Sequence, residues 1–289
     1  MYLVFDIETV VDWDLVYECE HNFAEGREEC LERFKAEHRK KQSTDRPFIP
    51  TRYHQPVSAV FIAASYGAQY LGHKVISSPS PPRFADEFWS VVRNAPDDFA
   101  EDVTLCSFNG KDFDILAMEV AAHRYGVKLP SWLTLFPRYA SDDKRSRYNN
   151  RAHLDLFAVF TSFQARMGGG LSFWSTVTGL PGKVCMDGGA VEEVLAKPDG
   201  LRQVNDYCMT DVLNTYGLLI HVLRSAGEID KDLPLTPFTY QMDHAIKQIT
   251  ADPQWLESGC VAQWVQAYRA AESTGNAANT VAEDDDIPF

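Results

Sequence analysis

Two acidic residues near the N-terminus, Asp6 and Glu8, follow a short apolar run, Tyr2–Phe5, that is typical of a β-strand. Side chains alternate between the two faces of a strand, so residues two apart lie on the same face. Two neighbouring carboxylates on an otherwise buried strand are unfavourable unless a cation neutralises them. The pair therefore indicates a divalent-metal site, although D-x-E alone is too short a pattern to be specific.

A third acidic residue, Asp114, ends the segment Asn109–Asp114. This segment joins a buried strand predicted at 103–108 to a helix predicted from Phe113 onwards, a usual place for a site in an α/β sheet. A structural interpretation is also available: Asp112 would cap the helix, and the helix dipole would favour an acid in the first turn.

A fourth acidic residue, Asp211, lies four residues after Tyr207 in a helix predicted over 201–223. Residues at this spacing share one helix face. An aspartate on an otherwise apolar stripe needs a partner. A purely structural Tyr–Asp hydrogen bond would also supply one.

The predicted elements that carry these residues begin with strands, continue with alternating strands and helices, and end with helices. This order predicts an α/β domain with a mixed central sheet flanked by helices. We expect residues 1–228 to form that domain, 229–269 a C-terminal helical extension, and 270–289 a disordered linker with an acidic tip. The predicted strands are 2–5, 57–66, 74–77 and 103–108, and the predicted helices are 84–93, 113–125, 171–178 and 201–223.

The composition excludes fibrous, collagen-like and wholly disordered proteins. The 289 residues are 45% hydrophobic and 24% charged, as in soluble globular proteins. No apolar run approaches the ~20 residues that span a bilayer, and the N-terminus lacks the basic and apolar regions of a signal peptide. The six cysteines are scattered without a C-x-x-C pair, which predicts reduced thiols, a cytoplasmic location and no structural zinc.

The net charge of −14 argues against nucleic-acid binding by the molecule as a whole, but the basic residues are clustered. Seven Lys and Arg residues lie in 33–52, and five lie in 138–151. These stretches form either local basic surfaces on an acidic body or ordinary solvated faces, and the sequence leaves both interpretations open.

Taken together, the three acidic sites resemble the DEDD superfamily of DnaQ-like, ribonuclease H-like 3′–5′ exonucleases. The matching patterns are F-D-I-E-T, N-x-x-x-F-D and Y-x-x-x-D, in that order. The tyrosine is typical of the DEDDy branch, which includes the proofreading domain of family B DNA polymerases. The sequence around these patterns is similar to that of a stand-alone bacterial family related to the proofreading domain. The similar segments are His153–Leu156, Gly179–Lys183, Met186–Gly188 and Asp211–Tyr216.

The resemblance implies a ribonuclease H-like exonuclease fold and a mechanism. Asp6, Glu8, Asp114 and Asp211 would hold two Mg²⁺ or Mn²⁺ ions, and Tyr207 would orient the attacking water. The enzyme would hydrolyse terminal phosphodiester bonds of single-stranded DNA from the 3′ end and release nucleoside 5′-monophosphates. Candidate contacts to the substrate, each with a structural alternative, are Thr9, Asn109, Lys183, Arg145 and Arg147. Asp155 is either a fifth acid near the site or a helix cap.

The last residues resemble the acidic C-terminal tip of bacterial single-stranded DNA-binding proteins. This resemblance implies docking to proteins that recognise that tip, with the terminal phenylalanine in an apolar pocket and the acids facing a basic rim. A solubilising acidic tail is the alternative. The residues of the expected docking tip are Asp284, Asp285, Asp286, Ile287, Pro288 and Phe289.

Two other functions compete with a DNA exonuclease in repair, recombination or replication. The first is a 3′–5′ exonuclease acting on RNA or short oligonucleotides, because no sequence feature identifies a reader of the 2′-hydroxyl. The second is a catalytically silent adaptor that presents the tail. The complete set of four carboxylates argues against the adaptor.

Overall fold

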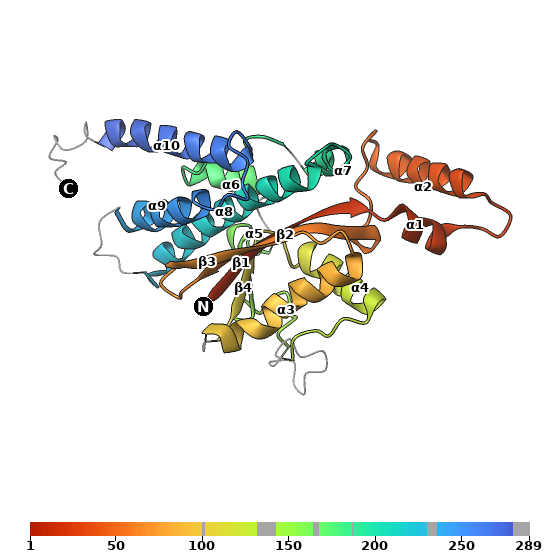
Figure 1. Cartoon of the computed structure of the whole chain (residues 1–289), viewed down its shortest axis with the longest axis horizontal. Helices are drawn as coiled ribbons and strands as arrows, with labels where there is room; N and C mark the ends of the chain where they lie inside the picture. Colours follow the sequence, from red (N-terminus) through yellow and green to blue (C-terminus); the bar gives the residue numbers. More distant parts are fainter. Residues whose placement is uncertain (100–101, 132–142, 164–167, 187, 230–235, 280–289) are drawn as a thin grey trace.

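The centre of the protein is a five-stranded mixed sheet in the order β3-β2-β1-β4-β5 (Figure 1). The computed structural model describes residues 1–99, 102–131, 143–163, 168–186, 188–229 and 236–279. The strands are β1 (Tyr2–Val11), β2 (His54–Ala64), β3 (Tyr70–Ile76), β4 (Thr104–Ser107) and β5 (His153–Asp155). β1 pairs antiparallel with β2 and parallel with β4. β3 is antiparallel to β2 and β5 is parallel to β4, so the predicted mixed sheet is confirmed.

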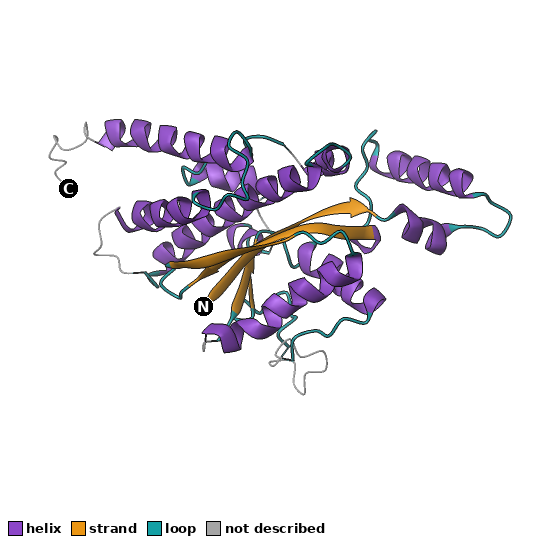
Figure 2. Ribbon diagram, in the orientation of Figure 1, coloured by secondary structure: helices purple, strands orange, loops and turns teal. Residues whose placement is uncertain are grey.

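Helices cover both faces of this sheet (Figure 2). α3 and α4 pack on one face, α8 and α9 lie on the other, and α6 and α10 pack against α8 (Figure 1). The helices of the two layers are α3 (Pro81–Phe99), α4 (Asp114–Tyr125), α5 (Leu156–Phe160), α6 (Leu171–Val177), α7 (Val191–Leu195), α8 (Gly200–Ala226), α9 (Thr236–Thr250) and α10 (Cys260–Asn279). A 3-10 turn, η3 (Gly188–Ala190), precedes α7.

The alternation of side chains along β1 decides which layer receives the acids. Leu3, Phe5 and Ile7 belong to the core shared with α3 and α4. The intervening positions face α8, so Asp6 and Glu8 lie on the α8 side. β1 is longer than the predicted 2–5, because its ladder with β2 continues to Val11. The two acids therefore lie in the middle of the strand and not at its end.

A helical arm joins β1 to β2, and we call residues 12–53 the β1–β2 arm. It contains α1 (Trp13–Glu20), α2 (Arg27–Gln42) and a 3-10 turn, η1 (Thr51–Tyr53). The arm lies at the end of the sheet where β1 ends, near α7 (Figure 1). It has a small apolar core of its own, formed by Val16, Phe34, Ile49 and Tyr53.

The C-terminal helices share the main core. Met242, Ile246 and Trp264 belong to the same buried cluster as residues of β1, β2 and α8. α10 continues to Asn279, so the prediction that the chain loses structure from residue 270 is wrong for 270–279. The segment contains several alanines, which have the highest helix propensity, and these extend the helix.

The prediction that all cysteines are reduced is also wrong for one pair, because Cys185 and Cys260 form a disulfide. Their Cα atoms are 5.5 Å apart although 75 positions separate them in sequence, and only the fold brings them together. Cys19, Cys30 and Cys106 are free thiols. Within the described part of the chain, no helix combines the length and hydropathy that crossing a lipid bilayer requires.

Candidate active site

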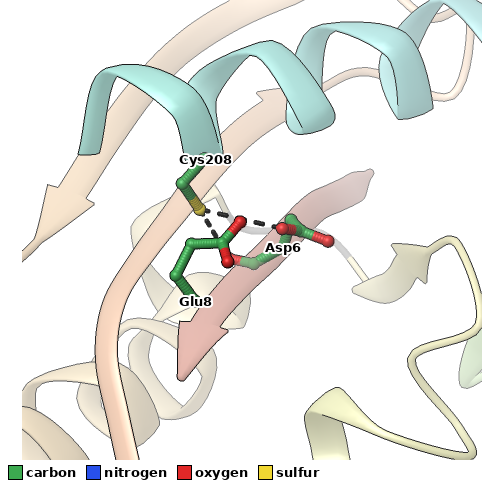
Figure 3. A group of neighbouring side chains, drawn as sticks. All are labelled: Asp6, Glu8 and Cys208. Atoms are coloured by element: carbon green, nitrogen blue, oxygen red, sulfur yellow. Dashed lines mark hydrogen bonds between the residues drawn. The ribbon is translucent and has the colours of Figure 1, made fainter. Parts of the chain in front are cut away.

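The side chains of Asp6 and Glu8 extend from β1 towards α8, where Cys208 lies beside them (Figure 3). Each residue offers a potential ligand atom, and the three atoms lie within 4.8 Å of one another. The register of β1 against β2 shifts between Glu8 and Thr9, an irregularity that redirects nearby side chains. Glu8 is buried, whereas Asp6 is only partly buried. The pair therefore forms an acidic surface to which solvent has access at Asp6.

Asp114, the first residue of α4, approaches this pair from the turn that follows the neighbouring strand β4. Its Oδ1 accepts a hydrogen bond of 3.1 Å from the backbone N–H of Ile7. The turn before α4 requires glycine at position 110, because a Cβ there would lie 2.7 Å from Ser107 Cβ and 3.2 Å from Asp114 Oδ2. The Asn-Gly break seen in the sequence thus allows this acid to approach the sheet closely.

Asp155 fixes the same turn from β5. Its carboxylate accepts hydrogen bonds from the backbone N–H groups of Asn109, at 2.8 Å, and Lys111, at 3.0 Å, and it also caps α5. The helix-cap interpretation of Asp155 is confirmed. Capping of α4 by Asp112 is wrong, because Phe113 precedes the first turn and no side chain caps it.

α8 contributes Tyr207 and Asp211, one turn apart. Lys183 Nζ lies 3.1 Å from Asp211 Oδ2 and donates a hydrogen bond of 2.6 Å to Tyr207 Oη. The other carboxylate oxygen, Asp211 Oδ1, is buried and has no hydrogen-bond partner among the described residues. An ammonium group among acids, next to an unpaired carboxylate oxygen, marks a place that requires positive charge. The potential metal ligands of Asp6, Glu8, Asp114 and Asp211 are carboxylate oxygens, which suit hard divalent cations.

The loop that carries Lys183 is held by Asn214, which sequence reasoning did not single out. Asn214 accepts a hydrogen bond from Gly182 N, at 3.1 Å, and donates one to Gly182 O, at 3.0 Å. Trp264 Nε1 donates to the same asparagine oxygen at 3.0 Å. The signal was present in D-V-L-N-T-Y, where the asparagine is the polar residue that follows Asp211 on the helix.

Cys208 was likewise not predicted as a site residue. Its thiol lies 3.4 Å from the backbone oxygen of Asp6 and 3.8 Å from Asp6 Oδ2. Burial, together with the charges of Asp6 and Glu8, raises the pKa of this thiol well above its ordinary value. A protonated thiol is a poor ligand for Mg²⁺ or Mn²⁺. We therefore assign Cys208 to hydrogen bonding behind Asp6, and not to metal binding.

Burial is the main cause that raises the pKa of every carboxyl group in the cluster. For Asp6 and Glu8, repulsion from neighbouring carboxylates raises the pKa further. The pKa of Asp114 is raised to about 7, although the hydrogen bond from Ile7 opposes the shift. Burial also raises the pKa of Asp211, and Lys183 opposes it. The cluster is thus unfavourable as four bare anions, and a bound cation or bound protons would stabilise it.

These shifts predict how stability depends on pH. A raised carboxyl pKa means that the folded protein binds more protons than the unfolded chain between about pH 4 and pH 7. Without divalent metal, the free energy of unfolding should therefore fall as pH rises through this window, by on the order of a few kcal/mol. Added Mg²⁺ or Mn²⁺ should restore it at pH 8 and have little effect at pH 5, as measured by chemical denaturation in EDTA and in metal.

An Asp114→Asn variant should show a flatter pH dependence than the wild type in EDTA. The matched control is Asp112→Asn, which changes an exposed acid on the same turn. Equal pH slopes in the two variants would contradict the assignment of Asp114 to the cluster.

Three of the other predicted substrate contacts have side-chain partners within the protein. Thr9 Oγ1 lies 2.7 Å from His54 Nδ1, beside Glu8. Arg145 forms an ion pair with Glu119, a buried acid of α4. Arg147 lies 3.3 Å from the carboxylate of Asp112. A phosphate would have to compete with these acids for either arginine, and contact with substrate stays a prediction for Thr9, Asn109, Arg145 and Arg147. The predicted docking tip, residues 284–289, lies outside the described residues.

The order of the sheet, with helices on both faces, defines a ribonuclease H-like exonuclease fold. The family described as a predicted 3′–5′ exonuclease related to the exonuclease domain of PolB matches residues 46–260, about three quarters of the chain. The chain belongs to this family. The matched segment includes Asp114, Lys183, Tyr207 and Asp211 and begins after β1. No curated protein matches the chain.

Proposed function

We propose that this protein is a two-metal-dependent 3′–5′ exonuclease that hydrolyses terminal phosphodiester bonds of single-stranded DNA and releases nucleoside 5′-monophosphates. The observation that carries the proposal is the convergence of four carboxylates from β1, α4 and α8, with an ammonium group among them and an unpaired oxygen on Asp211. Family membership supports nuclease activity in general. We place the activity in cytoplasmic DNA repair, recombination or replication.

Asp6, Glu8, Asp114 and Asp211 would hold the two ions, Mg²⁺ or Mn²⁺. When bound, such ions lower the pKa of a water molecule and stabilise the charge on the attacking and leaving oxygens. The carboxylates must be ionised to bind metal. Since their pKa values are raised, metal binding should release protons near neutral pH.

Tyr207 would orient the attacking water through its hydroxyl group. Burial and the nearby carboxylates raise the pKa of this phenol, so the hydroxyl keeps its proton and can donate a hydrogen bond. Because Lys183 Nζ occupies one lone pair of Tyr207 Oη, the phenol proton points elsewhere. Asp211 and water are the acceptors that this geometry leaves for it.

Lys183 would exchange partners during the reaction. Its side chain is 34% exposed and faces both Asp211 and Tyr207. Cations bound by the carboxylates would weaken the attraction of Lys183 to Asp211. The ammonium group would then be available to a phosphate oxygen of the substrate, which is the role expected from the sequence.

The experiment that tests this function is a digestion time course on 3′- and 5′-labelled oligonucleotides with Mg²⁺, with Mn²⁺ and with EDTA. Single-stranded DNA should be shortened stepwise from the 3′ end in either metal and left intact in EDTA. Duplex DNA and RNA of the same sequence establish the substrate preference. Faster digestion of RNA would replace the DNA assignment, and no digestion in any metal would favour the adaptor function.

We further propose that residues 284–289 dock to proteins that recognise the tip of single-stranded DNA-binding protein. The support is sequence alone: three acids followed by Ile287, Pro288 and Phe289. A peptide of residues 280–289 should bind such a protein, and Phe289→Ala should remove most of the affinity because a terminal aromatic anchor dominates a small interface. Fluorescence titration with displacement by free tip peptide measures this. Undetectable binding to several such proteins would leave the solubilising role.

A further inference from the structure

A groove of about 910 Å³ opens beside Glu8 and Thr9, between the β1–β2 arm and the body of the protein. One wall consists of α2 and residues 46–49, and the other of η3 and α7. A hydrogen bond of 3.3 Å from Trp13 Nε1 to Glu192 Oε1 joins the arm to α7. Since Glu8 belongs both to the acidic cluster and to the groove, the groove is continuous with the candidate active site.

The two walls carry opposite charge. Lys35 and Arg39 of α2 and Arg46 of the following loop line the arm side. Arg39 and Arg46 are exposed, and within the described residues neither has an ion pair with an acid. Glu192 and Glu193 line the α7 side. A polyanion in the groove would therefore place its phosphates against the arm and not against α7.

Aromatic side chains also line the groove, among them Phe48 and Phe113. Phe48 is 56% exposed, and its ring centroid is 5.6 Å from that of His54 and 6.0 Å from that of Phe113. Phe113 directly precedes Asp114. The position of Phe48 is fixed by Gln42, whose side chain bonds to both the backbone N–H and the backbone oxygen of Phe48, at 2.8 and 2.7 Å. An exposed ring held in place offers a face on which a base can stack.

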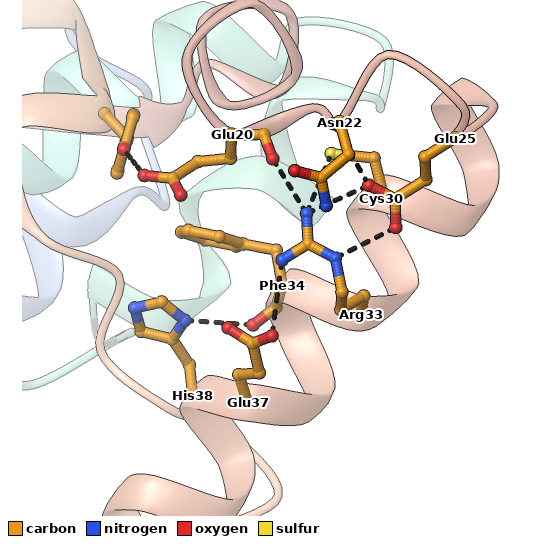
Figure 4. Close-up of polar contacts among 9 residues, drawn as sticks. Glu20, Asn22, Glu25, Cys30, Arg33, Phe34, Glu37 and His38 are labelled. Atoms are coloured by element: carbon orange, nitrogen blue, oxygen red, sulfur yellow. Dashed lines mark hydrogen bonds and ion pairs between the residues drawn. The ribbon is translucent and has the colours of Figure 1, made fainter.

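Besides its apolar core, the arm is ordered by the polar contacts of Arg33 (Figure 4). Arg33 makes two hydrogen bonds to the carboxylate of Glu25, at 2.9 and 3.0 Å, one to Glu37 at 3.2 Å and one to the backbone oxygen of Glu20 at 2.7 Å. These contacts tie α2 to the end of α1 and to the connection between the helices. Less conformational entropy is lost on binding when the surface is ordered beforehand.

We propose that this groove binds the single-stranded nucleic acid immediately 5′ of the scissile bond, with phosphates on Arg39 and Arg46 and a base stacked on Phe48. Cationic side chains beside aromatic faces are the features with which proteins bind single strands without reading sequence. The inference rests on the proposed exonuclease function, because that function places the 3′ end at Asp6 and Glu8. Lys35 and Arg39 precede residue 46, where the family match begins, whereas Arg46 and Phe48 lie within the matched segment.

The test compares Arg39→Ala/Arg46→Ala with Lys40→Ala/Lys41→Ala in the full chain. Both double variants remove two exposed cations of the arm, but Lys40 and Lys41 do not line the groove. Binding of a fluorescent oligothymidylate of about 15 nucleotides is titrated in EDTA at several salt concentrations. The Arg39/Arg46 variant should bind the oligonucleotide roughly tenfold or more weakly. The slope of log affinity against log salt concentration should become shallower by about 1.4, as expected for two lost phosphate contacts on a single strand.

A second readout separates the groove from the chemistry. With Mg²⁺, kcat/KM for the oligonucleotide should fall in the Arg39/Arg46 variant. It should not change for thymidine 5′-(p-nitrophenyl phosphate), which has no phosphate 5′ of the scissile bond for Arg39 and Arg46 to contact. If the wild type hydrolyses neither substrate, the exonuclease function fails but the binding comparison still decides on the groove. If the two double variants bind alike, the groove proposal is overturned.

Phe48 is tested by replacement with tryptophan and with leucine. Tryptophan keeps a stacking surface and should retain binding, whereas leucine keeps apolar bulk and should weaken binding several-fold. Equal binding by both would refute stacking. Binding of DNA and RNA strands of the same sequence shows which of the two the wild type prefers. The Arg39→Ala/Arg46→Ala variant should lose binding affinity for both. An equal loss with blunt duplex DNA would refute the single-strand assignment.

Discussion

Replacing Asp211 with alanine is expected to lower the rate of single-stranded DNA hydrolysis by roughly 10³-fold or more, because one carboxylate of the metal site is lost. The fold should survive, since the change removes one of four mutually repelling acids and Lys183, which is partly exposed, remains near the others. Single-turnover digestion measures the rate. Thermal unfolding with and without Mg²⁺ measures metal binding, and the stabilisation by Mg²⁺ should largely disappear.

The matched control for Asp211 is Asp206→Asn, a change of another buried acid of α8. Asp206 Oδ2 accepts a hydrogen bond of 3.2 Å from the N–H of Val261 at the start of α10, and an asparagine oxygen can replace it. This variant should lose little activity. Wild-type turnover by Asp211→Ala, or equal losses in both variants, would rule out the two-metal assignment.

Replacing Tyr207 with phenylalanine is expected to lower the single-turnover rate by roughly 10- to 100-fold, because the hydroxyl that orients the attacking water is lost. Stabilisation by Mg²⁺ should remain, since all four carboxylates are intact. The matched control is Tyr216→Phe, also on α8, where the lost hydroxyl donates a hydrogen bond of 2.6 Å to Ala68 O. The control should cost about 1 kcal/mol of stability without slowing hydrolysis. A rate for Tyr207→Phe equal to that of the wild type would make Tyr207 structural.

Hydrophobic periodicity predicted the helices and strands whose ends are also marked in the sequence. The helix predicted at 201–223 is α8, Gly200–Ala226, and the strand predicted at 57–66 is β2, His54–Ala64. The apolar run predicted a strand over 2–5 with Asp6 and Glu8 at its end. β1 continues because β2 pairs with it as far as Val11. The apolar pattern did not show how far the strand continues beyond the two acids.

The acids of the candidate site were also accessible to sequence reasoning, because each lies at a recognisable spacing within a predicted element. Their partners were not. Lys183 reaches Asp211 from a loop 28 positions earlier in the chain, and Cys208 was visible only as an apolar helix position. Contacts of this kind depend on the path of the chain between elements, which periodicity does not contain.

The groove and the disulfide also depend on contacts between residues far apart in the sequence, which local patterns do not predict. The basic stretch 33–52 was visible in the sequence, but both interpretations of it remained open. The arm folds back so that Arg39 faces Glu192, more than 150 positions later, across the groove. Likewise, nothing in the spacing of Cys185 and Cys260 pairs them, since their proximity is a property of the whole fold.

The hydrogen bonds of Asn214 give α10 a part in placing Lys183 of the candidate site. Trp264 of α10 bonds to Asn214, Asn214 bonds to Gly182, and the disulfide anchors the same loop at Cys185, two residues after Lys183. Shortening the chain to residue 228 would remove both supports while leaving every proposed metal ligand in place. Such a fragment would retain the proposed metal ligands but lose the contacts that position Lys183, so the candidate site depends on the chain at least as far as Trp264.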